Sequence, residues 1–363
     1  MLKHFGFDII FTLICLLVAS WWGFSHGGMA GLITALSVTL MLAILEISLS
    51  FDNAVVNASV LKGWNAFWKK IFLTVGILIA VFGMRLVFPI VIVAVTADLG
   101  LMEVMQLALK QPDVYADKLN AHHAEISAFG GMFLLLVFLK FMFGDKEHLW
   151  FAWLERKFLQ FSSVDAIAIF VALCVLMLSL TLVDDSKQAV VLSAGVWGVL
   201  IYLAVSVLSA LLEGNDNHDV HTENDTDANT GKQNHGTAGL SPAILKGGMV
   251  GFVYLEILDA SFSFDGVIGA FAITNDVIII MLGLAIGAMF VRSMTIFLVD
   301  KGTLSEYVYL EHGAHYAIGA LAIIMLLSAR FHIPELVTGS IGIVFIGLSL
   351  WHSIAYNKKL SDG

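Results

Sequence analysis

Two short acidic motifs, each inside a long apolar stretch, hold the side chains best suited to chemistry. The first is SLSFDNA at residues 48–54 and the second is SFSFDGV at residues 261–267. Six residues before the aspartate of each motif stands another carboxylate, which gives four acids: Glu46, Asp52, Asp259 and Asp265. A carboxylate near the middle of a bilayer costs roughly 2.5–3.5 kcal/mol on insertion scales. Because the chain repeats this cost in matching places, we expect a binding site there.

The candidate ligands of this site are all hard oxygen atoms. They come from Glu46, Asp52, Asn53, Glu256, Asp259 and Asp265, with the hydroxyls of Ser50 and Ser263 in support. No cysteine accompanies them. Oxygen-only sites suit Mg²⁺, Ca²⁺ or Mn²⁺ rather than Cu(I) or a thiolate zinc site. We therefore expect a divalent cation as the substrate and no prosthetic group.

Two arginines, Arg85 and Arg292, stand in apolar stretches after the two motifs. The five candidate carboxylates outnumber them, so the arginines cannot neutralise every acid. We expect the arginines to be counter-ions of the acids rather than ligands of the substrate. The alternative is that acids and arginines only hold helices together. Surplus buried acids can bind a proton when the metal leaves, which gives proton–metal antiport as a hypothesis.

Three further polar residues fall near the expected ends of membrane spans: His123, Glu125 and His315. Imidazole and carboxylate groups in such places could serve as gate or entry ligands for a cation. The simpler interpretation is that they are interfacial side chains with ordinary hydrogen bonds.

The composition is that of a helical membrane protein. The chain has 363 residues, of which 59% are hydrophobic and 13% charged, whereas soluble domains have about 25% charged residues. Several apolar windows exceed the roughly 18 residues that cross a bilayer as a helix. With four prolines and no regular polar–apolar alternation, the sequence favours an all-α membrane protein over a barrel. The net charge of −10 gives no indication of nucleic-acid binding.

We expect about ten (nine or ten) transmembrane helices. Their predicted bounds are 6–23, 29–61, 71–96, 124–143, 164–183, 189–212, 242–275, 276–298, 313–330 and 335–356. The second and the seventh are too long for one straight crossing, and each contains one acidic motif. Residues 144–162 have the amphipathic pattern of a segment on the membrane surface.

These spans divide the chain into six regions. They are an N-terminal membrane helix (1–28), a first three-span unit (29–143), the amphipathic segment with two linking spans (144–212), an acidic, histidine-containing loop (213–241), a second three-span unit (242–330), and a C-terminal span with its tail (331–363). The loop is expected to be a disordered linker, or else a metal-collecting segment. Twelve Lys and Arg residues fall on the N-terminal side of the spans and four on the other side. This bias predicts that both termini and the loop are cytoplasmic.

The two three-span units resemble each other beyond the acidic motifs. Gly76 and Arg85 stand nine residues apart, as do Gly283 and Arg292, and a histidine leads into the third span of each unit. The second unit begins five spans after the first. Because five is odd, the two units should cross the membrane in opposite directions. This is an inverted-topology repeat, which is typical of secondary transporters with sites near the midplane.

Straight helices would not bring the acids of one motif together. Two residues six apart point about 120° away from each other and lie about 9 Å apart along a helix. We therefore expect the helices to be broken near Ser50–Asn53 and near Ser263–Gly266. A break would let the acids converge and would free backbone carbonyls as ligands.

The two motifs together resemble the signatures of the TerC family of integral membrane proteins, within the LysE-type transporter superfamily. Residues 45–54 (LEISLSFDNA) resemble the first signature, and Glu256 to Asp265 with residues 271–276 (FAITND) and the downstream Arg292 resemble the second. The resemblance covers about half of the chain. The sequence departs from the family at residues 266–268 (GVI), where Ser-Ile-Pro is usual, and it looks like a divergent subfamily of unknown function.

The resemblance implies a metal-ion exporter in a cell (inner or plasma) membrane, because several members are associated with manganese efflux and the family name with tellurium resistance. It implies ligand roles for Glu46, Asp52, Asn53, Glu256, Asp259 and Asp265. The expected function is secondary transport of a divalent cation, with Mn²⁺ as first choice. One alternative is an exporter of a small organic solute or oxyanion, and another is a membrane assembly or metal-stress factor. An enzyme is not expected, since no nucleophile–base pair or cofactor motif is present.

Overall fold

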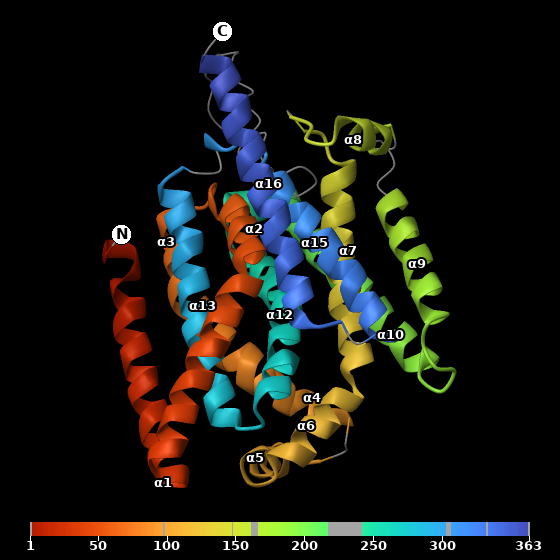
Figure 1. Ribbon diagram of the computed structural model, residues 1–363. Helices are drawn as coiled ribbons and strands as arrows, with labels where there is room; N and C mark the ends of the chain where they lie inside the picture. Colours follow the sequence, from red (N-terminus) through yellow and green to blue (C-terminus); the bar gives the residue numbers. More distant parts are fainter. Residues whose placement is uncertain are drawn as a thin grey trace.

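The computed structural model describes residues 2–96, 99–146, 148–160, 166–216, 242–302, 306–331 and 333–361. Within these ranges every regular element is a helix (Figure 1). Among the described residues, seven helices are long and apolar enough to cross a membrane. The prediction of an all-helical membrane protein is therefore confirmed. The predicted loop 213–241 begins later than expected, because α10 continues to Asp216, and residues 217–241 lie outside the described ranges.

The order of the helices follows the chain through two stretches. Before residue 144 they are α1 (Leu2–Leu49), α2 (Phe51–Leu61), α3 (Ala66–Ile71), the π-helical segments η1 (Phe72–Gly76) and η2 (Ile79–Val87), α4 (Phe88–Thr96), α5 (Leu101–Lys110), α6 (Pro112–Ala121) and α7 (His123–Phe143). After it they are α8 (Ala152–Leu159), α9 (Ala166–Leu180), α10 (Gln188–Asp216), α11 (Pro242–Lys246), α12 (Met249–Ile273), α13 (Val277–Asp300), α15 (Leu310–Ser328) and α16 (Glu335–Ser361).

Helix α1 consists of two arms joined by a sharp bend. Gly27 (φ −145°, ψ 16°) and Gly28 (φ +59°, ψ −142°) leave the helical conformation. The positive φ of Gly28 is readily adopted only by glycine. The bend separates the predicted span 6–23 from the helix that carries Glu46. In Figure 1 the two arms lie next to each other and meet at the lower end of the molecule.

The helices form one bundle with two distinct ends. In Figure 1, α8 and the end of α16 lie at the upper end, the start of α1 lies near mid-height, and α5, α6 and the bend of α1 lie at the lower end. Helix α7 runs from the lower end to the upper end, whereas α15 runs in the opposite direction beside it.

The helices that carry the motifs lie inside the bundle. In α2 every residue from Asp52 to Leu61 is buried, and α2 packs against α13 and α15. Outer helices expose large apolar side chains, such as Leu17 of α1, Phe170 of α9 and Trp351 of α16. Exposed apolar faces of this kind fit contact with lipid chains. The acidic motifs are therefore shielded from the bilayer by other helices.

The amphipathic segment predicted at 144–162 forms the short helix α8 at the upper end. Its Glu155 is fully buried and accepts a hydrogen bond of 3.0 Å from the hydroxyl of Tyr316 in α15. The backbone N–H groups of Trp150 and Phe151 also donate to this carboxylate. Nearby, burial lowers the pKa of Lys146 to about 8, against the opposing effect of Glu155. Helix α8 is thus attached to the bundle by a buried acid, which its amphipathic pattern did not predict.

Candidate functional site

The first motif contains the predicted helix interruption, but it is short. Only Ser50 leaves the helical conformation (φ −103°, ψ 15°), between α1 and α2. Its hydroxyl donates a hydrogen bond of 3.2 Å to Glu46 Oε1. Asp52 and Asn53 already belong to the first turn of α2, where the helix dipole stabilises a negative charge. The prediction is confirmed at Ser50 and is wrong for the residues after it.

The second motif lies in an uninterrupted helix. Helix α12 runs from Met249 to Ile273, so the break predicted at Ser263–Gly266 is wrong. Away from water, an intact helix keeps every backbone group hydrogen-bonded. The chain instead turns before the motif, at Gly247 (φ +79°) and Gly248 (φ +150°). One break is enough for convergence, because the contact between α2 and α12 brings the two motifs together.

The two motifs meet at a buried cluster of acids around Arg292. The Asn53 amide donates a hydrogen bond of 2.7 Å to Asp259 Oδ1, across 206 residues of sequence. Arg292 bonds to Glu256 through both terminal nitrogens, at 3.1 and 3.2 Å, and to Asp259 Oδ2 at 3.3 Å. The guanidinium also lies 4.1 Å from the centre of the Phe72 ring. Each of these four polar residues is no more than 6% exposed, so this charge cluster is removed from solvent.

A second buried ion pair joins Glu46 of α1 to Arg85 of η2. Arg85 also donates to the backbone carbonyl of Ala80. Glu46 lies against α12 and α13, since a Cβ added to Gly266 or to Gly287 would meet its side chain. The acid of the first motif therefore contacts the helix of the second.

The two ion pairs are placed in the same way within the two motifs. Glu46 and Asp259 are the acids six residues before each motif aspartate, and each pairs with the arginine that follows its own motif. Asp259 contacts Asn53, the residue after Asp52, and Glu46 lies against Gly266, the residue after Asp265. Each half of the site is thus completed by the other motif.

Asp52 lies apart from the arginines. Its Oδ1 accepts the backbone N–H of Asn53 at 3.0 Å. A Cβ on Gly342 would lie 3.6 Å from its carboxyl carbon, so the carboxylate packs against the backbone of α16. Among the described residues no ion pair includes Asp52. The side chain of Asp265 lies outside the described part of the structure.

The span containing Arg85 has two unusual π-helical segments, η1 and η2. π-Helical turns are rare and frequently occur at functional sites. Gly76 ends η1 against the central ion pair, because a Cβ there would meet Arg292 Nη1 and Glu256 Oε1. Gly76 therefore leaves room for the guanidinium of Arg292, whereas a Cβ on Gly283, its counterpart in the repeat, would meet Leu42 and the backbone carbonyl of Thr39.

The three residues considered as gate or entry ligands are not gathered at this cluster. His123 lies 3.2 Å from the hydroxyl of Ser127, and Glu125 forms a pair of 3.6 Å with His122. His315 stacks on Phe141 with ring centres 3.8 Å apart. His123 begins α7 and His315 lies in the second turn of α15, at opposite ends of the bundle. Their role as gate ligands stays a prediction.

Sequence reasoning missed several buried polar residues. Asp8 of α1 is 1% exposed and accepts a hydrogen bond of 2.9 Å from Ser293, the neighbour of Arg292. Asn57 is 2% exposed and lies one turn after Asn53 on α2. A carboxylate in the predicted span 6–23 and a second asparagine at helical spacing were the available signals.

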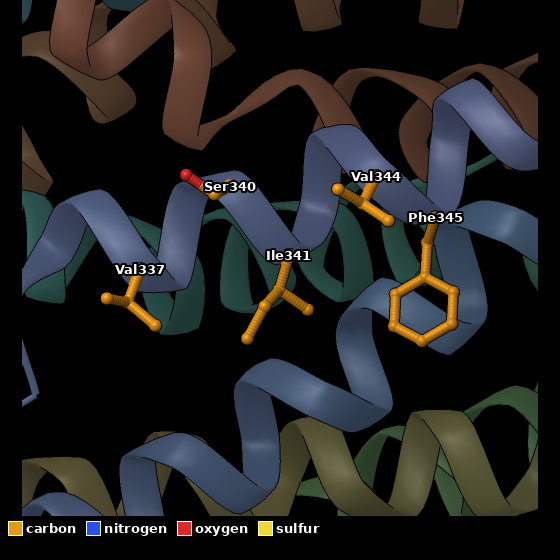
Figure 2. A pocket seen from close by; sticks show the side chains of 5 residues that line it. All are labelled: Val337, Ser340, Ile341, Val344 and Phe345. Carbon is orange, nitrogen blue, oxygen red and sulfur yellow. The ribbon is translucent and has the colours of Figure 1, made fainter.

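Glu46, Glu256 and Asp259 pair with arginines rather than surround a cation. In the described ranges no three His, Cys, Asp or Glu side chains are placed to hold a metal ion. A pocket of about 360 Å³ lies elsewhere, along α16 (Figure 2). It is lined by Val337, Ser340, Ile341, Val344 and Phe345, and no motif acid contributes to it. In this arrangement the arginines occupy the positions beside the acids.

A comparison with known protein families matches residues 51–360 to a family described as "Protein of unknown function (DUF475)". The matched range begins within the first motif and includes Asp52, Asn53, both arginines and the whole second motif. Glu46 and Asp8 precede it. No curated protein and no solved structure matches the chain. Because the match covers most of its length, the chain belongs to the DUF475 family of proteins of unknown function.

Proposed function

We propose that this protein is a secondary transporter that exports a divalent metal cation, with Mn²⁺ as the first candidate. The observation that carries the proposal is the contact between the two acidic motifs, made by Asn53 and Asp259 inside the bundle. Buried carboxylates are costly in a membrane and are generally functional. All the acids concerned offer hard oxygen ligands, which suit Mn²⁺.

The charges at the site suit a divalent cation. The described motif acids are Glu46, Asp52, Glu256 and Asp259, and the arginines are Arg85 and Arg292. Asp265 brings the motif acids to five, so with all of them and both arginines ionised the net charge is −3, which one divalent cation and one proton balance. The arginines then act as tethered counter-ions, and an entering cation displaces a guanidinium from its acids. Their engagement with acids also makes them poor ligands for an oxyanion, which disfavours the alternative substrate class.

The proposal includes an inverted repeat and ten membrane crossings. The matching contacts of Glu46 and Asp259 support the repeat, as do the opposite directions of α7 and α15. Ten crossings follow if the two arms of α1 count separately and if the apolar helices α9 and α12 also cross. Together with the bias of Lys and Arg, ten crossings support a proposed topology in which both termini are cytoplasmic.

In this mechanism the carboxylates bind the cation in one state, and arginines and protons in the other. With a cation bound, the carboxylates coordinate it. After release, the arginines pair with the acids again and two protons replace the two charges of the cation, which couples export to proton entry. Such proton coupling is a part of the proposal that can fail separately from cation transport.

The test is Mn²⁺ flux in proteoliposomes containing the full chain, at clamped voltage and with a second metal in competition. We expect flux above that of empty liposomes, and at least a tenfold loss in Asp52→Asn and Asp259→Asn, with the exposed Asp184→Asn as the control. Absence of flux in the wild type would overturn the proposal. Equal flux with and without a pH gradient would remove only the proton coupling.

A further inference from the structure

Three buried oxygen atoms near the contact of α2 and α12 have no hydrogen-bond partner. They are Asn53 Oδ1, Asn57 Oδ1 and Ser263 Oγ. Their residues are 2%, 2% and 4% exposed. A buried acceptor without a partner costs about 1–3 kcal/mol, so native structures rarely leave several together without a ligand or water to satisfy them.

The spacing of these oxygens arranges them along one line. Two contacts define antiparallel packing of α2 and α12: Asn53 with Asp259, and the indole N–H of Trp64 with the carbonyl of Ile244 just before α12. Asn57 lies one turn beyond Asn53 toward the upper end. Ser263 lies one turn beyond Asp259 toward the lower end. The three positions therefore span about two helical turns, roughly 11 Å, with the acids in the middle.

The chemistry of the line suits passage of a hard cation. Amide and hydroxyl oxygens coordinate such ions without contributing a negative charge. Conduction needs positions that bind a cation firmly enough to receive it and weakly enough to release it. The central carboxylates are strong ligands for a cation, and a neutral oxygen one turn away is a weaker ligand to which the cation can move.

The line is not the same on both sides of the acids. The residue at the position of Asn57 in the second motif, four after Gly266, is the buried Ala270. An amide oxygen therefore extends the polar line toward the upper end, and the corresponding place toward the lower end is apolar. Beyond Asn57 toward the upper end, α2 ends at Leu61 and is followed by Trp64, which is 4% exposed and packs against Gly251.

We propose that Asn57 Oδ1 forms a transit position for the transported cation, between the central acids and the Trp64 end of α2. The inference rests on the proposed function and names a residue that acts one step away from the central site. It predicts that Asn57 controls the rate at which the cation reaches or leaves the acids, and contributes little to its equilibrium affinity there.

The test compares Asn57→Leu with Ser59→Ala in the full-length protein, measuring Mn²⁺ flux in proteoliposomes and equilibrium Mn²⁺ binding in detergent. Leucine keeps the size of the side chain and removes its oxygen. We expect flux to fall about tenfold or more while the equilibrium affinity stays within about threefold. The control Ser59 is buried on the same helix, but its hydroxyl is already bonded to the Val56 carbonyl, so we expect wild-type flux.

A second variant, Asn57→Asp, keeps a polar side chain and carries the test if leucine prevents folding. The added carboxylate should hold the cation, so we expect tighter binding with slower flux. Wild-type flux in both variants would overturn the proposal, and would mean that Asn57 holds only water. A loss of binding as large as that of Asp259→Asn would also overturn it, because Asn57 would then belong to the central site. If the wild type itself moves no Mn²⁺, the proposed function fails as well.

Discussion

The two acidic motifs make corresponding contacts but neutralise their acids differently. In the first, one acid, Glu46, pairs with one arginine, Arg85. In the second, Arg292 is shared by Glu256 and Asp259. The position that holds Glu256 in the second motif is Ala43 in the first. The arginine of the second motif therefore pairs with one acid more than the arginine of the first.

The first motif contributes what the second lacks. Asn53 follows Asp52 and donates to Asp259, whereas the residue after Asp265 is Gly266, which has no side chain to donate. The two motifs therefore make complementary contacts, with an acid from one and an amide donor from the other.

Removing the shared arginine should have the largest effect. Arg292→Gln leaves Glu256 and Asp259 buried without a cation, so we expect a loss of about 3–5 kcal/mol in the free energy of unfolding. Thermal or denaturant unfolding in detergent would measure it. The control is Arg330→Gln, because Arg330 pairs with Asp184 on the surface and should contribute less than about 1 kcal/mol. Equal losses in the two variants would contradict the assignment.

Breaking the pair of Glu46 and Arg85 should lower the free energy of unfolding less than removing Arg292. Arg85→Gln leaves only Glu46 unpaired, and we expect about 3 kcal/mol, the lower end of the same range. Adding Glu46→Gln should restore part of this loss, since no unpaired charge then remains. The same unfolding experiment applies. A larger loss for Arg85→Gln than for Arg292→Gln would reverse the comparison between the halves.

Filling the space beside Arg292 should lower the stability less than either arginine substitution. Gly76→Ala places a methyl group against Arg292 and Glu256, and we expect a loss of about 1–3 kcal/mol in stability. Gly83 in the same span is the matched control, because its Cβ would make only an ordinary contact of 3.5 Å with Ile79. If both alanine variants behave alike, Gly76 has no special relation to the ion pair.

Two hydrogen bonds donated by tryptophan side chains offer a smaller contrast, one from Trp64 after α2 and one from Trp22 of α1. Trp64→Phe removes a hydrogen bond of 2.9 Å to the Ile244 carbonyl, with an expected loss of about 1 kcal/mol. Trp22→Phe removes a bond of 2.8 Å to the carboxylate of Asp276, and bonds to charged groups contribute about 1.5–3 kcal/mol. Unfolding of the two variants should therefore rank Trp22 above Trp64, and the opposite order would count against this account of the two bonds.

The stability of the protein should also depend on pH through Lys146, which lies outside the two motifs. Lys146 has a pKa of about 8 in the folded protein, lowered by burial from its ordinary 10.5. Between these values the unfolded chain binds the proton more strongly, so stability should rise slightly with pH from about 8 to 10.5. Lys146→Met should lack this rise in unfolding measurements at pH 8 and 10. An unchanged pH dependence would assign the effect to another group.

The sequence predicted the membrane class, the arginine partners and the meeting of the two motifs, because these follow from composition, charge and an internal repeat. It did not predict that α12 stays helical through Ser263–Gly266. The geometric argument considered each helix alone, whereas the contact between helices supplies the convergence. Asp8, Asn57 and the burial of Glu155 were missed for a related reason: which face of a helix is buried depends on neighbours that are distant in sequence.

The central claim is that both motifs form one cation site, and equilibrium Mn²⁺ binding to the purified full-length protein tests it most directly. Wild type, Asp52→Asn and Asp259→Asn would be compared for affinity and stoichiometry. The account predicts one ion bound tightly per chain, with affinity reduced at least tenfold by either substitution. Two tightly bound ions per chain, with each variant losing only its own, would contradict it.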